Sequence, residues 1–196
     1  MEAAVCYSGG KDSTLAALLL DPFYDVTLVC ATADVTDAAE HAREAAEAVG
    51  FPFETVTLDR QAVEEAAATM VEDGYPRNGI QAIHEHALEV VAGLEYDAIA
   101  DGTRRDDRVP TVSRAHAQSI EDRHGVDYLS PLSGFGRRAV DRLVDTHLDV
   151  ESGPSEEIPK GDYETELRAL VAQEYDDAAV TDIFPEHTQT RVRGRR

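Results

Sequence analysis

The chain has 196 residues, enough for one α/β domain with a full core and a small C-terminal appendage. It contains no stretch of 18 apolar residues and starts with an acidic strand rather than a leader, so we expect a cytoplasmic protein with no membrane partner. The net charge is −21, and only two of the 18 basic residues are lysines. This composition is typical of halophilic proteins, whose carboxylates keep them hydrated in a salt-rich cytoplasm.

Short apolar runs bounded by turn or charge signals predict strands, and these alternate along the chain with helical segments. In chain order, the predicted strands are residues 3–7, 26–31, 53–57, 96–100 and 126–129. The predicted helices are residues 12–20, 37–49, 61–72, 78–92, 114–124, 137–147 and 160–174. We expect Thr36 to cap the second helix and Gly50 to end it, Asn78 to cap the fourth, and Thr111 or Ser113 to cap the fifth.

A glycine-rich turn joins the first predicted strand to the first predicted helix. It consists of Ser8, Gly9, Gly10, Lys11, Asp12 and Ser13. Two glycines let the backbone turn tightly and approach an anion closely. The helix start directs unpaired N–H groups and the positive end of the helix dipole to the same place, and Lys11 and the two serine hydroxyls add donors. The pattern predicts a phosphate-binding loop, the alternative being a turn that binds nothing.

The common Walker A pattern does not fit this turn, because Val5 stands where its first glycine would be and Asp12 where it needs Ser or Thr. The turn instead resembles the PP-loop, SGGxDS, of the ATP pyrophosphatases, an adenine nucleotide α-hydrolase-like family. Such enzymes cleave ATP to AMP and pyrophosphate and adenylate an acceptor, which a nucleophile then attacks. The resemblance implies bound ATP and Mg²⁺, and catalytic roles for Lys11 and Asp12.

Strand–helix alternation at this spacing predicts an α/β fold, a Rossmann-like doubly wound parallel five-stranded sheet with helices on both faces. The resemblance adds the strand order 3-2-1-4-5, with the ligand at the carboxyl ends of the first and fourth strands. We expect a PP-loop ATP-binding domain at residues 1–150. Residues 151–196 are expected to form a short C-terminal helical extension and a basic tail, either disordered or folded back on the active site.

The loop after the fourth predicted strand emerges beside the PP-loop, where related enzymes border the nucleotide and hold the acceptor. Gly102 would permit close approach there, and Arg104 would neutralise phosphate. Asp106 or Asp107 is expected to act in catalysis, and Asp106 to hold Mg²⁺ on the triphosphate together with Asp12. The alternative is a surface loop whose Asp and Arg side chains pair with one another.

Several other positions are weaker candidates. Asp34 follows the second strand, where the family receives adenosine, although an exposed loop aspartate fits equally well. His84 and His86 are two apart on a helix and point to different faces, which argues against a shared metal site. Residues 161–165 resemble the Gly-Glu-Tyr/Phe-Glu-Thr stretch of PP-loop ligases that amidate diphthine, with Asp162 in place of Glu.

The acceptor is less constrained by the sequence. Cys6 and Cys30 both fall in predicted buried strands, so a thiolation reaction would need a separate sulfur carrier or partner subunit. Small archaeal-type PP-loop proteins of this length resemble predicted tRNA-modification subunits, and this favours a tRNA base as acceptor. The alternatives are an ammonia-dependent amide-forming ligase, similar to diphthamide synthetase, and a non-catalytic ATP-binding module. A second copy of the chain, forming a homodimer, is a further candidate partner.

Arginine is unevenly distributed in this acidic chain. Residues 101–142 carry eight basic and seven acidic side chains, and the last six residues contain four arginines. The rest of the chain is strongly acidic, so these two segments are the parts where negative charge does not dominate. Such segments favour binding of phosphate or nucleic acid. Residues 101–142 and the arginines of the last six residues are together predicted to bind tRNA.

Overall fold

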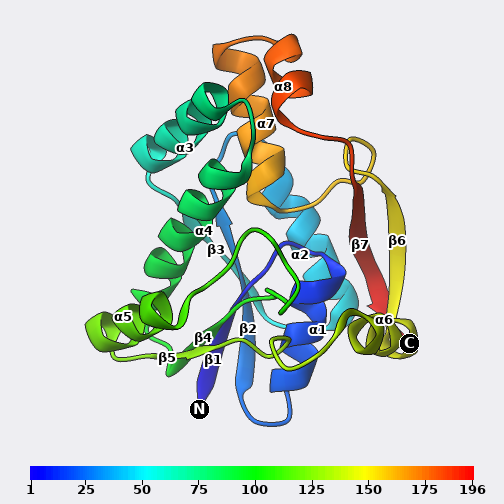
Figure 1. The fold of residues 1–196 in the computed structure, drawn as a ribbon. Helices are drawn as coiled ribbons and strands as arrows, with labels where there is room; N and C mark the ends of the chain where they lie inside the picture. Colours follow the sequence, from blue (N-terminus) through cyan, green and yellow to red (C-terminus); the bar gives the residue numbers. More distant parts are fainter.

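The computed structural model describes residues 1–196 apart from the side chain of Ala178. A parallel five-stranded sheet runs through its centre in the order β3-β2-β1-β4-β5 (Figure 1). The strands are β1 (Glu2–Cys6), β2 (Asp25–Thr32), β3 (Phe53–Thr57), β4 (Ala98–Ala100) and β5 (Asp127–Leu129). The predicted α/β class, strand order and doubly wound arrangement are confirmed.

Helices cover both faces of this sheet (Figure 1). One face carries α1 (Lys11–Leu20) and α2 (Ala38–Val49), with α6 (Arg137–His147) packed against α1. The other carries α4 (Arg77–Ala92) and α5 (Arg114–His124), with α3 (Arg60–Asp73) beside α4. Beyond the carboxyl ends of the strands lie α7 (Tyr163–Glu174) and α8 (Asp177–Ile183). At the carboxyl ends of β1 and β4 the structure leaves a cavity, the place where α/β folds of this kind bind ligands.

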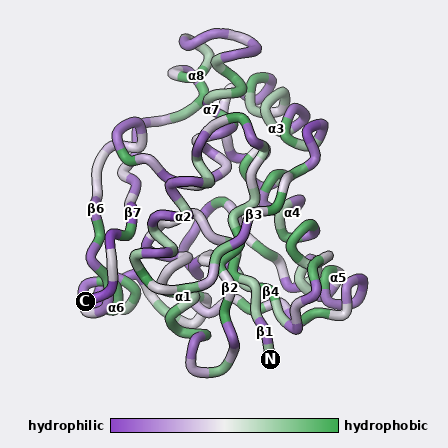
Figure 2. Tube along the Cα trace, turned by 180° about the vertical axis from the view of Figure 1, so that it is seen from behind, coloured by the Kyte–Doolittle hydropathy of each residue, from purple (hydrophilic) through white to green (hydrophobic). Residues whose placement is uncertain are grey.

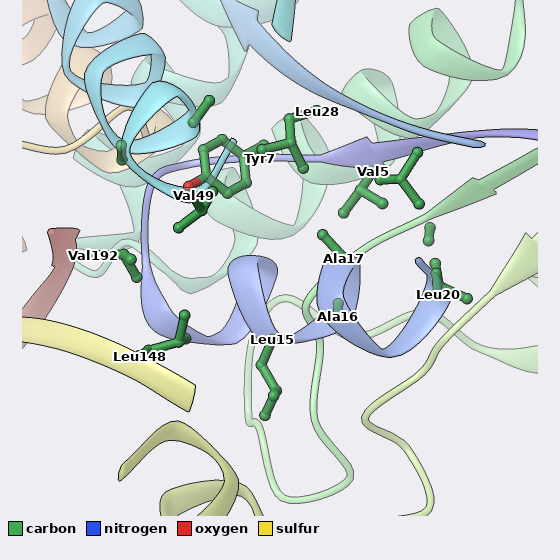
Figure 3. Close-up of a cluster of buried hydrophobic side chains, with 14 of the residues drawn as sticks. Val5, Tyr7, Leu15, Ala16, Ala17, Leu20, Leu28, Val49, Leu148 and Val192 are labelled. Carbon is green, nitrogen blue, oxygen red and sulfur yellow. The ribbon is translucent and has the colours of Figure 1, made fainter. Parts of the chain in front are cut away.

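Buried apolar side chains fill the space between the sheet and each helical layer. Figure 3 shows the cluster around α1, where Ala17 faces Val5 and Leu28 of the sheet and Leu15 extends from the opposite side of the helix. Small alanines on α1 and α2 allow these helices to approach the strands closely. Gly50 ends α2 in the left-handed conformation with φ 74°, as predicted.

A second sheet, which was not predicted from the sequence, completes the C-terminal part of the chain. Strands β6 (Leu148–Pro154) and β7 (Thr188–Arg195) pair antiparallel and pack against α1, α2 and α6. The expected helical extension is present as α7, whereas most of the expected basic tail belongs to strand β7. Most residues of β7 are hydrophilic (Figure 2), and two of its polar side chains, Gln189 and Arg191, are buried. Inward-facing polar groups hide the alternation that identifies a strand.

Two predicted helix caps have different outcomes. Ser113 caps α5 by accepting a hydrogen bond from the His116 N–H, at 3.1 Å, as expected. Asn78 does not cap α4: the helix starts at Arg77, and the Asn78 amide donates to Asp73 instead. No helix of the described residues is long and apolar enough to cross a membrane.

Candidate functional site

The turn between β1 and α1 holds an open arrangement of backbone donors. Gly9 has φ 77°, a conformation that favours glycine. The Gly9 carbonyl accepts from the Val192 N–H and the Ser8 carbonyl from the Gly161 N–H, each at 2.9 Å. The Gly10 carbonyl accepts from the backbone and hydroxyl of Thr14. Three successive carbonyls are thus engaged, whereas no acceptor among the described residues is paired with the N–H groups of Ser8, Gly9 or Gly10. Free N–H groups on successive residues of a turn favour an anion.

Charged side chains flank this loop. The Lys11 ammonium lies 2.8 Å from one carboxylate oxygen of Asp12 and 3.9 Å from Asp141. The other Asp12 oxygen lies 3.7 Å from the Arg104 guanidinium, so Arg104 reaches the start of α1 from the loop after β4. The first turn of α1 adds N–H groups that have no partner within the helix.

A cavity of about 710 Å³ opens in front of the loop, large enough for a nucleotide. Much of its wall is formed by the PP-loop, the loop after β4, the segment around residues 160–164 and the start of β7, and side chains of α4, α6 and β6 complete it. The expected site residues Ser8, Lys11, Asp12, Ser13, Gly102, Arg104 and Asp107 all line it.

The loop after β4 approaches the PP-loop as closely as its backbone allows. A Cβ added at Gly102 would lie 2.6 Å from the Ser13 nitrogen, so only glycine fits there without a shift. Asp107 accepts three hydrogen bonds from Arg104, from its backbone N–H and from its guanidinium. Asp106 does not line the cavity and lies 3.9 Å from Arg104. The pairing expected of a self-contained Asp/Arg loop is therefore present, and it holds Arg104 towards Asp12.

Asp34 is not brought to the cavity. Its backbone is left-handed with φ 56°, and its carboxylate accepts from the Thr57 hydroxyl at 3.4 Å. The end of β2 is occupied instead by the buried carboxylate of Glu166, from α7. Glu166 accepts from the Thr32 hydroxyl at 2.8 Å and from the Ala33 N–H at 2.7 Å.

A buried polar cluster at the end of β4 was not predicted from the sequence. Asp101, almost fully buried, accepts from the Tyr128 hydroxyl and lies 3.0 Å from His84 Nε2. It also accepts from the backbone and hydroxyl of Thr103. Burial by itself would raise the pKa of Asp101, but the hydrogen bond from His84 and the Thr103 donors bring it below its ordinary value. Asp101 is therefore held as a carboxylate.

His84 and Asp101 both line the cavity, so this pair forms part of its floor. His86 faces away and accepts from the Asp59 N–H. The two histidines do point in different directions, as predicted. A signal for His84 existed in the sequence, because it falls on the apolar stripe of α4 beside Ile83 and Ala87.

Both cysteines are buried and unpaired. Burial raises the pKa of Cys30 to about 12, and burial together with the charge of Asp101 raises the pKa of Cys6 well above its ordinary value. Cys6 lines the cavity, but as a neutral thiol it is a weak nucleophile.

The C-terminal wall of the cavity is a network of charged groups. Asp162 accepts from the Gln189 amide at 3.1 Å and lies 3.1 Å from the Lys160 ammonium. Glu164 pairs with Arg168 and lies 3.4 Å from His187. Burial and the nearby charge of Asp162 raise the pKa of Glu164. Lys160 was not identified as a site residue from the sequence.

Fold and loop together define a PP-loop-type α/β protein. The chain belongs to a family of unknown function (DUF7411), whose model matches residues 1–194. It is 40% identical to an uncharacterised protein of Methanocaldococcus jannaschii, MJ0690, over 99% of this chain and 96% of that one.

Solved structures give two further similarities. A protein of Methanocaldococcus jannaschii described as a predicted subunit of tRNA methyltransferase matches with a TM-score of 0.90 and 38% identity, over 100% of this chain and 98% of the other. The predicted resemblance to archaeal tRNA-modification subunits is thereby confirmed. The U34-tRNA thiolase NcsA of Methanococcus maripaludis matches with a TM-score of 0.46 and 16% identity, over 74% of this chain and 56% of the other.

Proposed function

We propose that this protein binds ATP at the PP-loop and cleaves it to AMP and pyrophosphate while adenylating an acceptor. The observation that carries the proposal is the set of free N–H groups at Ser8, Gly9 and Gly10, facing no protein acceptor, beside the Lys11 ammonium. These groups and the start of α1 bind a polyphosphate without distortion of the fold.

The chemistry follows from which phosphate the loop holds. With the β and γ phosphates in the loop, the α-phosphorus faces the remainder of the cavity. A nucleophilic atom of the acceptor attacks it, the bond to the bridging oxygen breaks, and the electron pair leaves with pyrophosphate. A second nucleophile then displaces AMP. Fixed donors at the leaving group stabilise its developing charge.

Magnesium fits this proposal as a partner of the nucleotide rather than of the protein alone. The described residues hold no group of three or more His, Cys, Asp or Glu side chains able to bind a metal ion. Mg²⁺ is commonly held by one or two carboxylates together with substrate phosphates. Asp12 is the carboxylate available at the loop, and Mg²⁺ bound there would neutralise phosphate charge.

For the acceptor, we propose a tRNA that binds at arginines without an ion pair, most of them on the loop after β4 and on α6, two elements that contribute to the cavity wall. Several arginines have no carboxylate partner among the described residues. One is Arg196, which donates to a backbone carbonyl. The others are Arg77, Arg105, Arg108, Arg114, Arg138 and Arg142. All of them are exposed, and most belong to the loop after β4 and to α6. Unpaired cations in a chain of net charge −21 are suited to a polyanion.

The arginine tail has a different role from the one predicted. Arg191 is buried and pairs with Glu44, and Arg193 pairs with Glu151. Arg195 lies over the Phe51 ring and 3.8 Å from Asp21. These side chains fix β7 to the domain, so the tail is not a free cationic arm, and the proposed RNA face is restricted to the arginines without ion pairs.

Product analysis tests the reaction. ATP labelled in the γ-phosphate is incubated with the protein, Mg²⁺ and bulk tRNA from cells lacking it, with the Lys11→Ala variant as control. We expect label in pyrophosphate together with AMP, both strongly reduced in the variant. Label in orthophosphate, without contaminating pyrophosphatase, would indicate ordinary ATPase chemistry. ATP binding without turnover under every condition would favour a non-catalytic module.

The RNA face is tested separately. Replacement of Arg138 and Arg142 by Gln removes two unpaired cations, and replacement of Arg43 and Arg193 removes two paired ones. We expect only the first pair to weaken tRNA binding and to flatten its salt dependence, by about one unit of slope for each RNA phosphate that is no longer neutralised. Equal effects of both pairs would argue against this face.

An ammonia-dependent amide-forming ligase remains the second candidate. It is favoured by the position of Gly161, Asp162, Tyr163 and Glu164, which line the same cavity as the PP-loop. This is the segment that resembles the diphthine-amidating ligases. Ammonium-dependent release of AMP with a protein acceptor, and unchanged modified nucleosides in tRNA from a deletion strain, would select this alternative.

A further inference from the structure

We propose that Lys160 is a second phosphate-binding lysine, which reaches over the PP-loop from the C-terminal part of the chain and holds the departing pyrophosphate. This assignment rests on the proposed function and deepens it. It identifies a binding group outside the glycine-rich turn, 149 positions beyond Lys11 in the sequence.

The first argument comes from composition. The chain has 18 basic residues, of which Lys11 and Lys160 are the only lysines. Both line the 710 Å³ cavity. Every basic position outside the cavity is arginine, so lysine occurs only where the chain faces the proposed phosphate site. A compact ammonium with three donors can follow a phosphate chain as it moves, whereas a planar guanidinium has fixed donor directions.

The second argument comes from Gly10. Its φ is −81° and its ψ is 164°, an extended conformation that any residue adopts, so backbone geometry does not require glycine here. A Cβ added at Gly10 would lie 3.0 Å from the Lys160 Cε and 3.4 Å from its Nζ. The missing side chain of Gly10 therefore makes room for the Lys160 ammonium over the loop.

The third argument is that Lys160 is held in place before any ligand binds. The next residue, Gly161, donates its N–H to the Ser8 carbonyl at 2.9 Å. A Cβ at Gly161 would lie 2.5 Å from the Ala42 Cβ and 2.9 Å from the Ala38 carbonyl, so this segment packs directly on α2. Two close backbone approaches, one to the PP-loop and one to α2, fix the root of the Lys160 side chain.

A counter-ion completes the arrangement. Lys160 Nζ lies 3.1 Å from Asp162, and its side chain retains 19% exposure. Burial by itself would raise the pKa of Asp162, but the charge of Lys160 and the Thr165 donors bring it below its ordinary value. Asp162 therefore stays ionised beside the ammonium. A phosphate that enters the loop competes with Asp162 for the Lys160 ammonium. Because the Lys160 side chain is already oriented, binding costs less conformational entropy.

The expected role is specific to the β and γ phosphates. Lys11 is paired with Asp12 at the helix start, and Lys160 supplies a second positive charge from the C-terminal part of the cavity wall. As the α–β bond breaks, negative charge accumulates on the leaving pyrophosphate. A cation fixed beside the loop stabilises that charge more than it stabilises AMP.

The test compares three probes, ATP, AMP and inorganic pyrophosphate, by titration calorimetry with Mg²⁺ on the full chain. Lys160→Gln removes the charge, Lys160→Arg retains it, and Arg193→Gln is a control of equal charge change, since Arg193 lies outside the cavity wall. We expect Lys160→Gln to weaken ATP and pyrophosphate binding by about 10- to 100-fold, with AMP affinity changed by less than about twofold. Lys160→Arg should recover part of this loss.

The possible outcomes of this titration distinguish the role of Lys160 from the proposed function. Wild-type affinity of Lys160→Gln for ATP and pyrophosphate would overturn the role of Lys160 while leaving the proposed function intact. Equal losses for all three probes, with a lowered melting temperature, would show a structural role and overturn it too. A wild-type protein that binds neither ATP nor pyrophosphate would overturn the proposed function itself. Lys160→Arg serves as the folded variant if Lys160→Gln does not fold.

Discussion

A single methyl group at Gly102 tests whether the loop after β4 and the PP-loop form one site. In Gly102→Ala the new Cβ would meet the Ser13 nitrogen at 2.6 Å, the Ser13 Cα at 2.8 Å and the Asp12 carbonyl carbon at 2.9 Å. All three atoms are backbone atoms of the first turn of α1 and cannot rotate away. Such overpacking costs about 1–3 kcal/mol of unfolding free energy.

In a chain of this length, that cost corresponds to a fall in melting temperature of about 2–12 °C. We expect a larger effect on ATP turnover than on stability. The loop after β4 must move away from α1, and Arg104 moves with it. Arg104 lies 3.7 Å from Asp12 and would be drawn away from that carboxylate. A shift of about 1 Å in the position of such a group lowers turnover by about 10- to 100-fold.

Gly134→Ala is the matched control. A Cβ at Gly134 meets no atom within 4 Å, and its backbone is not left-handed. Alanine should therefore stabilise the fold by about 0.4–1 kcal/mol, through lower entropy of the unfolded chain. Calorimetric melting and AMP release are measured on both variants. Equal melting temperatures and equal ATP turnover in the two variants would refute the close approach at Gly102.

Three other perturbations act on the loop, the cysteines and β7. Lys11→Ala and Asp12→Ala should each cost about 1.5–3 kcal/mol of ATP binding with the melting temperature nearly unchanged, and wild-type affinity in both would contradict the PP-loop assignment. Cys6 and Cys30 should resist alkylation at pH 8 in the folded protein and react on denaturation, because burial raises both pKa values, as mass spectrometry can show. Truncation after Thr190 should lower both the melting temperature and ATP affinity, whereas an effect on tRNA binding alone would restore the free cationic tail.

Features determined by neighbouring residues could be predicted from the sequence. The PP-loop is one continuous segment between a strand and a helix, so its chemistry and position are visible together. The strand order placed the loop after β4 beside it, and Gly102 is found at that contact. Alternation of apolar runs was enough for the five parallel strands because each is short and bounded by polar turns.

Features that depend on distant residues could not be predicted in the same way. Glu166 occupies the end of β2 from more than 130 positions away, and no local pattern indicates that contact. Strand β7 buries Gln189 and Arg191, whose partners Asp162 and Glu44 come from the start of α7 and from α2. Polar side chains that pair with such distant partners look like loop residues when the sequence is considered alone.

Two segments of the C-terminal part of the chain donate to the carbonyl groups of the PP-loop, and its N–H groups are left without protein partners. A glycine-rich turn exposes both donors and acceptors, and an anion is bound only if the acceptors are directed elsewhere. Here the Ser8 carbonyl is occupied by Gly161 and the Gly9 carbonyl by Val192. The C-terminal segments therefore do more than cover the domain. They engage the groups that would repel phosphate, and the donor face of the turn is left to the ligand.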